Sequence, residues 1–392
     1  MKKYILLLAA ACQGLAMMAQ SPAYKMKVIL KDGTTLNALT EDVEEISFAK
    51  LGKVKVDISE RYKTSTSLAV NLDIDANASE LKAVCVPASQ PVPNPKDYIE
   101  RNATVDHKGP YKKSFDFLTP ETDYVIYALA YDANGLPSEV SELRMTTGKP
   151  ADDPFTVEAT TTATKVDYSV TPKDPKIEKY ITICTGLDYY NKWCDDGNNA
   201  GDVLEHFVAL WQAMASMYGM AWQDEMWEYE THTGTTSDIQ GHLMWNADQV
   251  LISFGVNKDG TLASAIQVDK FKTKAPAKSD IKINLTLKTN EWRNVVVGAE
   301  VSNDDTYLVI VQPASAVGDR TGAEITKWLL YEGNSDLSDY AKSGSQDWEF
   351  VPSKGGQKYY AIAFGMEDGA PTTEPVMIEF ELPQGRFGVM GK

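Results

Sequence analysis

The chain has 392 residues, with 38 Lys and Arg against 55 Asp and Glu, which gives a net charge of −17. A protein this acidic disfavours nucleic acids and anionic membranes as partners, because both carry the same sign of charge. An aromatic content of 10% together with frequent Gly and Pro favours an all-β protein. At about 100–200 residues per domain, the length predicts two to four domains.

Residues 1–19 predict a secretory signal peptide. Lys2 and Lys3 precede an uncharged apolar stretch from Tyr4 to Ala19, and the small residues of "AMMAQ" favour cleavage after Ala19. Cleavage removes two Lys, so the mature charge becomes 36 − 55 = −19. Cys12 in "AAACQG" leaves a lipid anchor as the alternative. No later window has the ~18 consecutive apolar residues of a membrane span. We expect an exported protein, on the outer-membrane surface, in the periplasm or secreted.

A short hairpin segment is predicted over residues 20–50. The stretch "YKMKVILKDGTTLNALTEDVEEISF" reads as two strands around "KDGTT", followed by a short acidic and aromatic strand. It is similar to an N-terminal hairpin found in many secreted proteins of the Bacteroidetes. The resemblance adds to the expectation of export.

Three repeats follow the hairpin. Each contains an apolar alternating strand that enters a turn ending in Gly, namely "YALAYDANG", "ISFGVNKDG" and "IAFGMEDG". The turn glycines are spaced by 260 − 135 = 125 and 369 − 260 = 109 residues, which suits one sandwich domain each. The pattern predicts a mainly β fold of tandem antiparallel β-sandwiches. We expect them at 51–148, 153–274 and 279–384, with a tail at 385–392.

The first repeat carries a specific motif. Leu118, Pro120, Thr122 and Tyr124 stand in the order L-x-P-x-T-x-Y. This resembles the tyrosine corner of the fibronectin type III superfamily, in which the Tyr hydroxyl bonds back to the chain between the two sheets. The other repeats depart from it. The second has Gln249 at the Tyr position, and the third keeps Tyr359 without the Leu and Pro.

The second repeat is enlarged by a helical insertion over about residues 188–230. Asp202 is expected as an N-cap, and Gly219 is expected to end or kink the helix. We expect one buried face, whose members follow 3–4 spacing: Val203, Phe207, Leu210, Met214, Met217 and Trp222. Glu205, Gln212 and Ser216 are expected on the opposite face. The helix is expected to cap an open edge or end of its own sandwich.

Part of this insertion is the candidate binding surface. Trp and Tyr are favoured at binding hot spots, and Met adapts to irregular partners. The candidate residues are Trp211, Tyr218, Trp222, Trp227 and Tyr229. Signal peptide, hairpin and tandem repeats together resemble adhesion-like surface proteins of the Bacteroidetes. The resemblance implies non-catalytic binding of a protein at the cell surface, and a carbohydrate-binding accessory protein that stacks glycan on the aromatic residues is the alternative.

The sequence predicts no enzyme, metal site or cofactor. No pair among His107, His206, His232 and His242 has the i, i+4 spacing of a zinc protease. The Asp-Gly and Asn-Gly turns lack the further acidic ligands of a calcium loop. Acidic residues among the aromatics of the insertion leave glycoside hydrolysis as a third class, and these are Asp224, Glu225, Glu228 and Glu230.

Three cysteines remain in the predicted mature chain, namely Cys85, Cys184 and Cys194. Cys184 and Cys194 are close enough in sequence to form a disulfide, which export would permit. Cys85 lies in the alternating strand "LKAVCVPA" and is expected to be a buried thiol.

Overall fold

The computed structural model of the chain describes residues 25–30, 33–40, 54–194, 203–333 and 337–384. The predicted signal peptide, Cys12 and the expected N-cap Asp202 lie outside these residues. Internal contacts divide the chain into two units, residues 1–53 and 54–392. In the first unit, β1 (Lys25–Ile29) pairs antiparallel with β2 (Thr35–Leu39), as the hairpin pattern predicts. The expected third strand of that segment falls outside the described residues.

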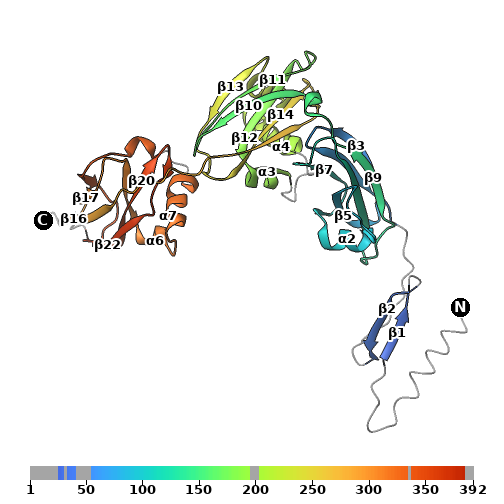
Figure 1. Ribbon diagram of the computed structural model, residues 1–392, viewed down its shortest axis with the longest axis horizontal. Coiled ribbons are helices and arrows are strands. Elements are labelled where there is room, and N and C mark those ends of the chain that lie inside the picture. Colours follow the sequence, from blue (N-terminus) through green and yellow to red (C-terminus); the bar gives the residue numbers. More distant parts are fainter. Residues whose placement is uncertain (1–24, 31–32, 41–53, 195–202, 334–336, 385–392) are drawn as a thin grey trace, which may run out of the picture. The chain divides into compact units, whose positions relative to one another are not determined.

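The first sandwich has two antiparallel sheets with strand orders β3-β4-β7 and β6-β5-β8-β9 (Figure 1). Its elements are β3 (Val56–Lys63), β4 (Leu68–Ile74), β5 (Ala78–Pro87), α2 (Pro95–Asn102), β6 (Val105–His107), β7 (Tyr111–Phe115), β8 (Asp123–Asp132) and β9 (Ser141–Thr146). Alternate side chains of both sheets meet in one core, as Leu68 and Leu72 of β4 do with Ile126 of β8. Because successive side chains of a strand point to opposite faces of its sheet, every second residue of these strands points into the core.

The second sandwich has strand orders β10-β11-β13 and β12-β14-β15. Its elements outside the insertion are η2 (Pro150–Asp152), β10 (Phe155–Thr161), β11 (Val166–Pro172), β12 (Lys179–Gly186), β13 (Thr236–Gln240), β14 (Asp248–Val256) and β15 (Gln267–Lys272). Leu251 of β14 joins the core between the sheets. Its neighbours Val250 and Ile252 belong to a second cluster on the outer face of the same sheet. Both faces of β14 are therefore covered, which explains why consecutive apolar residues such as Val250, Leu251 and Ile252 occur in it.

The third sandwich has strand orders β16-β17-β19 and β18-β20-β21, with β22 also paired to β20. Its strands are β16 (Ile283–Glu291), β17 (Asn294–Val301), β18 (Tyr307–Pro313), β19 (Gln346–Phe350), β20 (Gln357–Glu367), β21 (Ala370–Pro371) and β22 (Val376–Leu382). Its helical segments are α6 (Ala314–Val317), α7 (Ala323–Lys327), η4 (Trp328–Glu332) and η5 (Ser338–Tyr340). These sheets confirm the predicted fold class of tandem antiparallel β-sandwiches.

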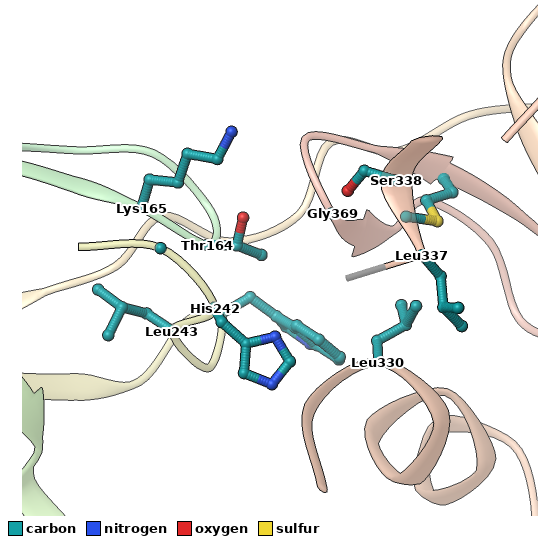
Figure 2. Close-up of a pocket in the computed structure, with 11 residues that line it drawn as sticks. Thr164, Lys165, His242, Leu243, Leu330, Leu337, Ser338 and Gly369 are labelled. Carbon is teal, nitrogen blue, oxygen red and sulfur yellow. The ribbon is translucent and has the colours of Figure 1, made fainter. Parts of the chain in front are cut away.

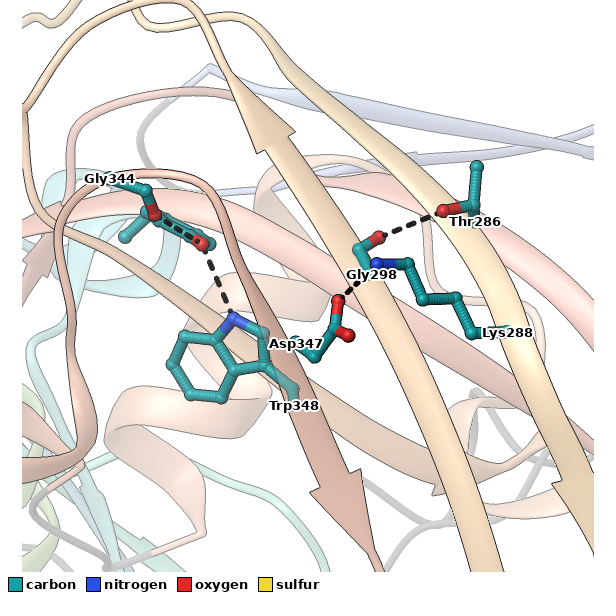
Figure 3. A network of polar contacts seen from close by, with 7 residues as sticks. Thr286, Lys288, Gly298, Gly344, Asp347 and Trp348 are labelled. Atoms are coloured by element: carbon teal, nitrogen blue, oxygen red, sulfur yellow. Dashed lines mark hydrogen bonds and ion pairs between the residues drawn. The ribbon is translucent and has the colours of Figure 1, made fainter.

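A polar network fixes β19 in the third sandwich (Figure 3). The indole nitrogen of the buried Trp348 donates to the Tyr307 hydroxyl at 3.3 Å, and that hydroxyl donates to the carbonyl oxygen of Gly344 at 3.0 Å. Lys288 of β16 pairs with Asp347 of β19 at 2.5 Å on the outside of the sheet. The two large aromatic side chains are buried with their polar atoms bonded, as buried polar groups require.

In all three repeats, a side chain at the start of the long central strand forms a hydrogen bond with the backbone five residues earlier. The Tyr124 hydroxyl accepts a hydrogen bond from the backbone nitrogen of Thr119 at 3.0 Å, which is the contact that the tyrosine-corner resemblance implies. The Tyr359 hydroxyl donates to the carbonyl of Lys354 at 2.8 Å. In the second sandwich, Nε2 of Gln249 donates to the carbonyl of Met244 at 3.3 Å. Each bond reaches back five residues, so Gln249 takes the place of the tyrosine.

A helical segment also follows the third strand of each sandwich and covers the outer face of a sheet. In the first sandwich α2 packs against β5 and β8, with Ile99 buried among Val84, Val125 and Leu129. In the third, α6 contacts β18 and β20. The expectation that the insertion of the second sandwich caps an edge or an end is corrected below, because it too covers a face.

Candidate functional site

The insertion of the second sandwich comprises α3 (Leu187–Cys194), α4 (Val203–Tyr218), α5 (Trp222–Glu225) and the π-helical η3 (Met226–Glu230). It lies over the outer face of the β12-β14-β15 sheet. Leu204, Trp211 and Met226 of the insertion are buried in one cluster with Ile252 and Phe254 of β14. Burial of these apolar side chains on the sheet holds the insertion in place.

Helix α4 buries only part of the predicted face: Val203 is buried and Phe207 packs against the same cluster, as predicted. Leu204, Trp211 and Ala215 are buried, whereas Leu210 and Met217, which were expected inside, are 45% and 78% exposed. Two neighbouring stripes of the helix both have helical spacing and no charge, so periodicity alone cannot choose between them. The stripe that contains Trp211 buries the larger side chain and packs on the sheet.

Leu210, Met214 and Met217 were predicted inside and lie outside instead. Together with Tyr218 they form what we call the outer face of α4. Their exposed fractions are 45%, 41%, 78% and 71%. They stand at i, i+4, i+7 and i+8, so they form one continuous ridge on the helix. No charged residue lies between His206 and Asp224 in the sequence. An uncharged ridge of this kind contrasts with a chain of net charge −17.

Helix α4 ends where the sequence predicts. Gly219 has a φ of +69°, the left-handed conformation that favours glycine at the end of a helix. The backbone nitrogen of Met220 donates to the carbonyl of Ala215 at 3.1 Å and satisfies one of the last helical acceptors. The chain then turns into α5, which packs against α4.

The side chain of Trp222 is enclosed on two sides. Its indole stacks on Trp211 with centroids 6.3 Å apart and planes 8° from parallel. A methyl group placed on Gly260 would lie 2.1 Å from Cη2 of Trp222, so this ring rests directly on the β14–β15 hairpin turn. Trp222 is therefore a packing residue between α4 and the hairpin, and not an open platform.

Trp227 is also engaged, and the two tyrosines of the predicted surface are not. The Lys179 ammonium lies 4.5 Å from the Trp227 ring centroid and donates to the Trp227 carbonyl at 2.6 Å. Tyr218 and Tyr229 are 71% and 70% exposed. Of the five predicted binding residues, Trp211 is buried, Trp222 and Trp227 are half-buried, and only the two tyrosines present most of their ring to solvent.

Side chains of the first sandwich contact the insertion. The Tyr190 hydroxyl of α3 donates to Oδ2 of Asp116 at 2.7 Å. Burial raises the pKa of Tyr190 well above its usual value, and the Asp116 carboxylate adds to the rise. Lys112 forms an ion pair with Glu205 of α4. These contacts leave the outer face of α4 uncovered, because its residues keep the exposures given above.

The disulfide that the spacing of Cys184 and Cys194 would allow is not formed. Cys85, Cys184 and Cys194 are all free thiols in the part of the chain that the structure describes. Cys184 of β12 packs with the core between the sheets, whereas Cys194 of α3 packs with the insertion on the outer face. The sheet separates them. Burial raises the pKa of Cys85 and of Cys184 to about 12, so neither thiol is poised to react.

Figure 2 shows a cavity between the second and third sandwiches. Its volume is about 50 Å³, and its lining includes Thr164, His242 and Leu330. His242 Nε2 lies 3.0 Å from the carbonyl of Tyr331, and the Thr164 hydroxyl donates to the carbonyl of Asp368 at 2.5 Å. Ligand pockets are typically ~300–1,000 Å³. This gap is a feature of the junction and is too small for such a ligand.

Two larger pockets, each of about 390 Å³, are lined by charged groups that include ones already engaged with neighbouring side chains. In the first, Asp116 accepts hydrogen bonds from Tyr190 and Ser114. In the second, Asp248 pairs with Lys270 at 2.8 Å. Neither pocket contains Asp224 or Glu228, the exposed carboxylates considered for glycoside hydrolysis. Asp188 of α3 lines the second pocket, but none of the four carboxylates considered for glycoside hydrolysis lines either one.

Among the described residues, no group of three or more His, Cys, Asp or Glu side chains is placed to hold a metal ion. Within the same ranges, no helix has the length and apolar character needed to span a bilayer.

No family model and no curated protein matches the sequence. Among solved structures, the chain is similar to the chicken CNTN1 FN1–FN3 domains, with 10% identity, a TM-score of 0.20, and coverage of 85% of this chain and 98% of that one. The central fibronectin-III array of RIM-binding protein gives 10% identity, a TM-score of 0.18, and coverage of 65% and 82%. The chitinase ChiA74 from Bacillus thuringiensis gives 16% identity and a TM-score of 0.18, over 34% of this chain and 19% of that one. At these TM-scores, none of the three carries an argument about what this chain binds or does.

Proposed function

We propose that this chain is an exported, non-catalytic binding protein of the adhesion type, and that the outer face of α4 is its contact surface. The observation that carries the proposal is the exposed ridge of Leu210, Met214, Met217 and Tyr218 on an acidic protein. Exposed apolar side chains that cluster rather than scatter are typical of interaction sites. The insertion is bound to a rigid sheet, so the ridge is presented in a fixed conformation.

The rest of the site supports binding rather than chemistry. The aromatic side chains nearest the ridge are used for packing, as Trp211 and Trp222 show by their stacking. Met214 and Met217 are flexible and polarisable, so they adapt to the shape of a partner. Binding residues often lie on segments that connect the strands of a rigid scaffold. Here the sandwich is the scaffold and the insertion carries the contact surface.

Adhesion of coated beads tests this proposal. Beads that carry the mature chain are applied to surfaces of whole cells, and the retained fraction is compared with that of the variant L210S/M217S. The variant is expected to lose most of the retention, because both side chains are exposed and their replacement leaves the core intact. The control is L136S/V351S, which removes apolar residues that are 51% and 68% exposed elsewhere. Equal loss in both variants, or in neither, contradicts the proposal.

A carbohydrate ligand is the second candidate, and the exposed rings of Tyr218 and Tyr229 are the observation that favours it. Sugar rings stack on open aromatic faces, and the engaged Trp222 and Trp227 do not offer theirs. A glycan array would show binding that disappears in Y218A/Y229A and persists in L210S/M217S. Absence of any glycan signal would remove this candidate.

A further inference from the structure

The outer face of α4 is an exposed apolar ridge, and the charged residues of the same segment indicate what kind of partner it can bind. The segment from Val203 to His232 contains five acidic residues and no Lys or Arg. One of them, Glu205, is paired with Lys112 from the first sandwich, and Glu225 is buried. Asp224 and Glu228 are exposed, and among the described residues neither takes part in an ion pair.

These carboxylates belong to the same packed body as the ridge. Asp224 lies on α5 and Glu228 on η3, the two segments that directly follow α4. The stacking of Trp222 on Trp211 ties α5 to α4. The part of the insertion that contains the ridge thus carries acidic residues and no Lys or Arg, so a partner that binds the outer face of α4 is favoured when it is positively charged.

From this combination we infer that the outer face of α4 binds a basic amphipathic helix, a segment with apolar residues at helical spacing and Lys or Arg beside them. This inference rests on the proposed function and names the class of its partner. Helix α4 has 16 residues, about 24 Å at 1.5 Å per residue, so it can align with three to four turns of a partner helix. Apolar helix faces that pack against each other need this i, i+4, i+7 arrangement of anchors.

Charge argues against the two other occupants of such a ridge. A second copy would bring a net charge of −17 and its own Asp224 and Glu228 to the interface. Like charges across an interface disfavour association. An anionic bilayer would be repelled for the same reason. Of these three partners, only a basic amphipathic helix offers apolar side chains to the ridge and positive charges to the carboxylates.

The test uses the mature chain and a labelled synthetic peptide of about 14 residues, with Leu and Lys in amphipathic helical order, whose length as a helix is about 21 Å. Fluorescence anisotropy gives the Kd. L210S/M217S is expected to weaken binding about tenfold, the effect of losing central anchors. L136S/V351S, the matched apolar control, is expected to leave the Kd unchanged. A scrambled peptide of identical composition is expected to bind about tenfold more weakly to the unaltered chain.

The carboxylates are tested separately. D224N/E228Q is expected to weaken binding several-fold at about 0.05 M salt and much less at about 0.5 M, because salt screens exposed charges. The control D304N/E349Q removes the same charge from exposed acids of the third sandwich and is expected to have no effect. Equal effects of the two variants would mean that only net charge matters, and would overturn the inference.

Three other results would also overturn it. These are equal affinity for the scrambled peptide, concentration-dependent dimerisation without peptide that L210S/M217S abolishes, and binding to phosphatidylcholine vesicles in place of the peptide. If bead adhesion still depends on Leu210 and Met217 while the peptide fails, the proposed function stands and the class of partner is wrong. If neither measurement responds to L210S/M217S, both fail.

Discussion

At the scale of single residues, Asp269 shows how burial controls a charge at the edge of a sandwich. It lies half-buried on β15, and Nε2 of Gln267 donates to its Oδ2 at 2.9 Å. Burial raises the pKa of Asp269 from 3.8 to about 6, and the nearby Asp153 carboxylate adds to the rise. The hydrogen bond from Gln267 and the charge of Lys173 act in the opposite direction and are outweighed.

A carboxyl group with a raised pKa stabilises the folded state at low pH and loses that contribution as pH rises through the folded pKa. Because the pKa of Asp269 is 3.8 when unfolded and about 6 when folded, its contribution declines between these values. D269N, which keeps an acceptor for Gln267, is expected to be roughly 1–3 kcal/mol more stable than the unaltered chain at pH 7, since a pKa difference of 1 corresponds to about 1.4 kcal/mol. Denaturant titrations across this pH range measure the difference. If the difference in free energy of unfolding between the two proteins is the same below pH 3.8 and above about pH 6, the raised pKa of Asp269 is contradicted.

The three backbone-directed side chains at the start of the central strands give a second prediction. Y124F leaves the backbone N–H of Thr119 without its side-chain acceptor, so we expect a loss of about 1 kcal/mol in the first sandwich. Q249L should cost clearly less. The Met244 carbonyl keeps the Thr273 hydroxyl as a donor, and the substitution removes a buried Oε1 that has no partner among the described residues. Hydrogen exchange in each sandwich during thermal unfolding measures the loss of stability caused by each substitution. A loss in Q249L equal to that in Y124F would contradict this explanation.

At the scale of elements, the packing of the insertion depends on a glycine that has no side chain to obstruct Trp222. Gly260 has a φ of +86° and lies beneath that indole. Gly135 is the equivalent turn residue of the first sandwich, with a φ of +74° and no atom within 4 Å of an added methyl group. Both positions carry the same conformational cost for alanine, of about 1 kcal/mol.

Only G260A adds a steric clash to that cost. We expect it to displace Trp222 and to cost about 1–3 kcal/mol more than G135A, the range for overpacking. Hydrogen exchange of residues 203–230, measured by mass spectrometry, should accelerate in G260A and stay unchanged in G135A. Acceleration of similar size in both variants would show that the Trp222 contact does not hold the insertion.

The elements also show what the sequence could reveal and what it could not. Strand alternation and turn glycines predict the sheets, and the residues from Leu118 to Tyr124 predict the bond of the first corner. Gln249 departs from the motif in sequence, although its five-residue offset from Met244 repeats that of Tyr124 from Thr119. The predicted buried face of α4 is right at Val203 and Phe207 and wrong at Leu210, Met214 and Met217, because two neighbouring apolar stripes of the helix have the same periodicity. Only the sheet beneath decides between them.

At the scale of the whole molecule, export is a prediction that rests on the first 19 residues. The mature chain is expected to begin at Gln20, because the apolar stretch continues past Cys12 to the small residues before it. Mass spectrometry of the intact protein from the producing cells measures this directly. A mass that corresponds to an acylated Cys12 would instead indicate a lipid anchor.

The central claim is that the chain works by binding a partner through the outer face of α4. A photoreactive benzophenone side chain in place of Met217, which is 78% exposed, tests it in the cells that produce the protein. The same group in place of Val351, 68% exposed on the third sandwich, is the control. We predict one dominant cross-linked protein from position 217 that is absent from position 351. No adduct at position 217, or the same adducts from both positions, would contradict the claim.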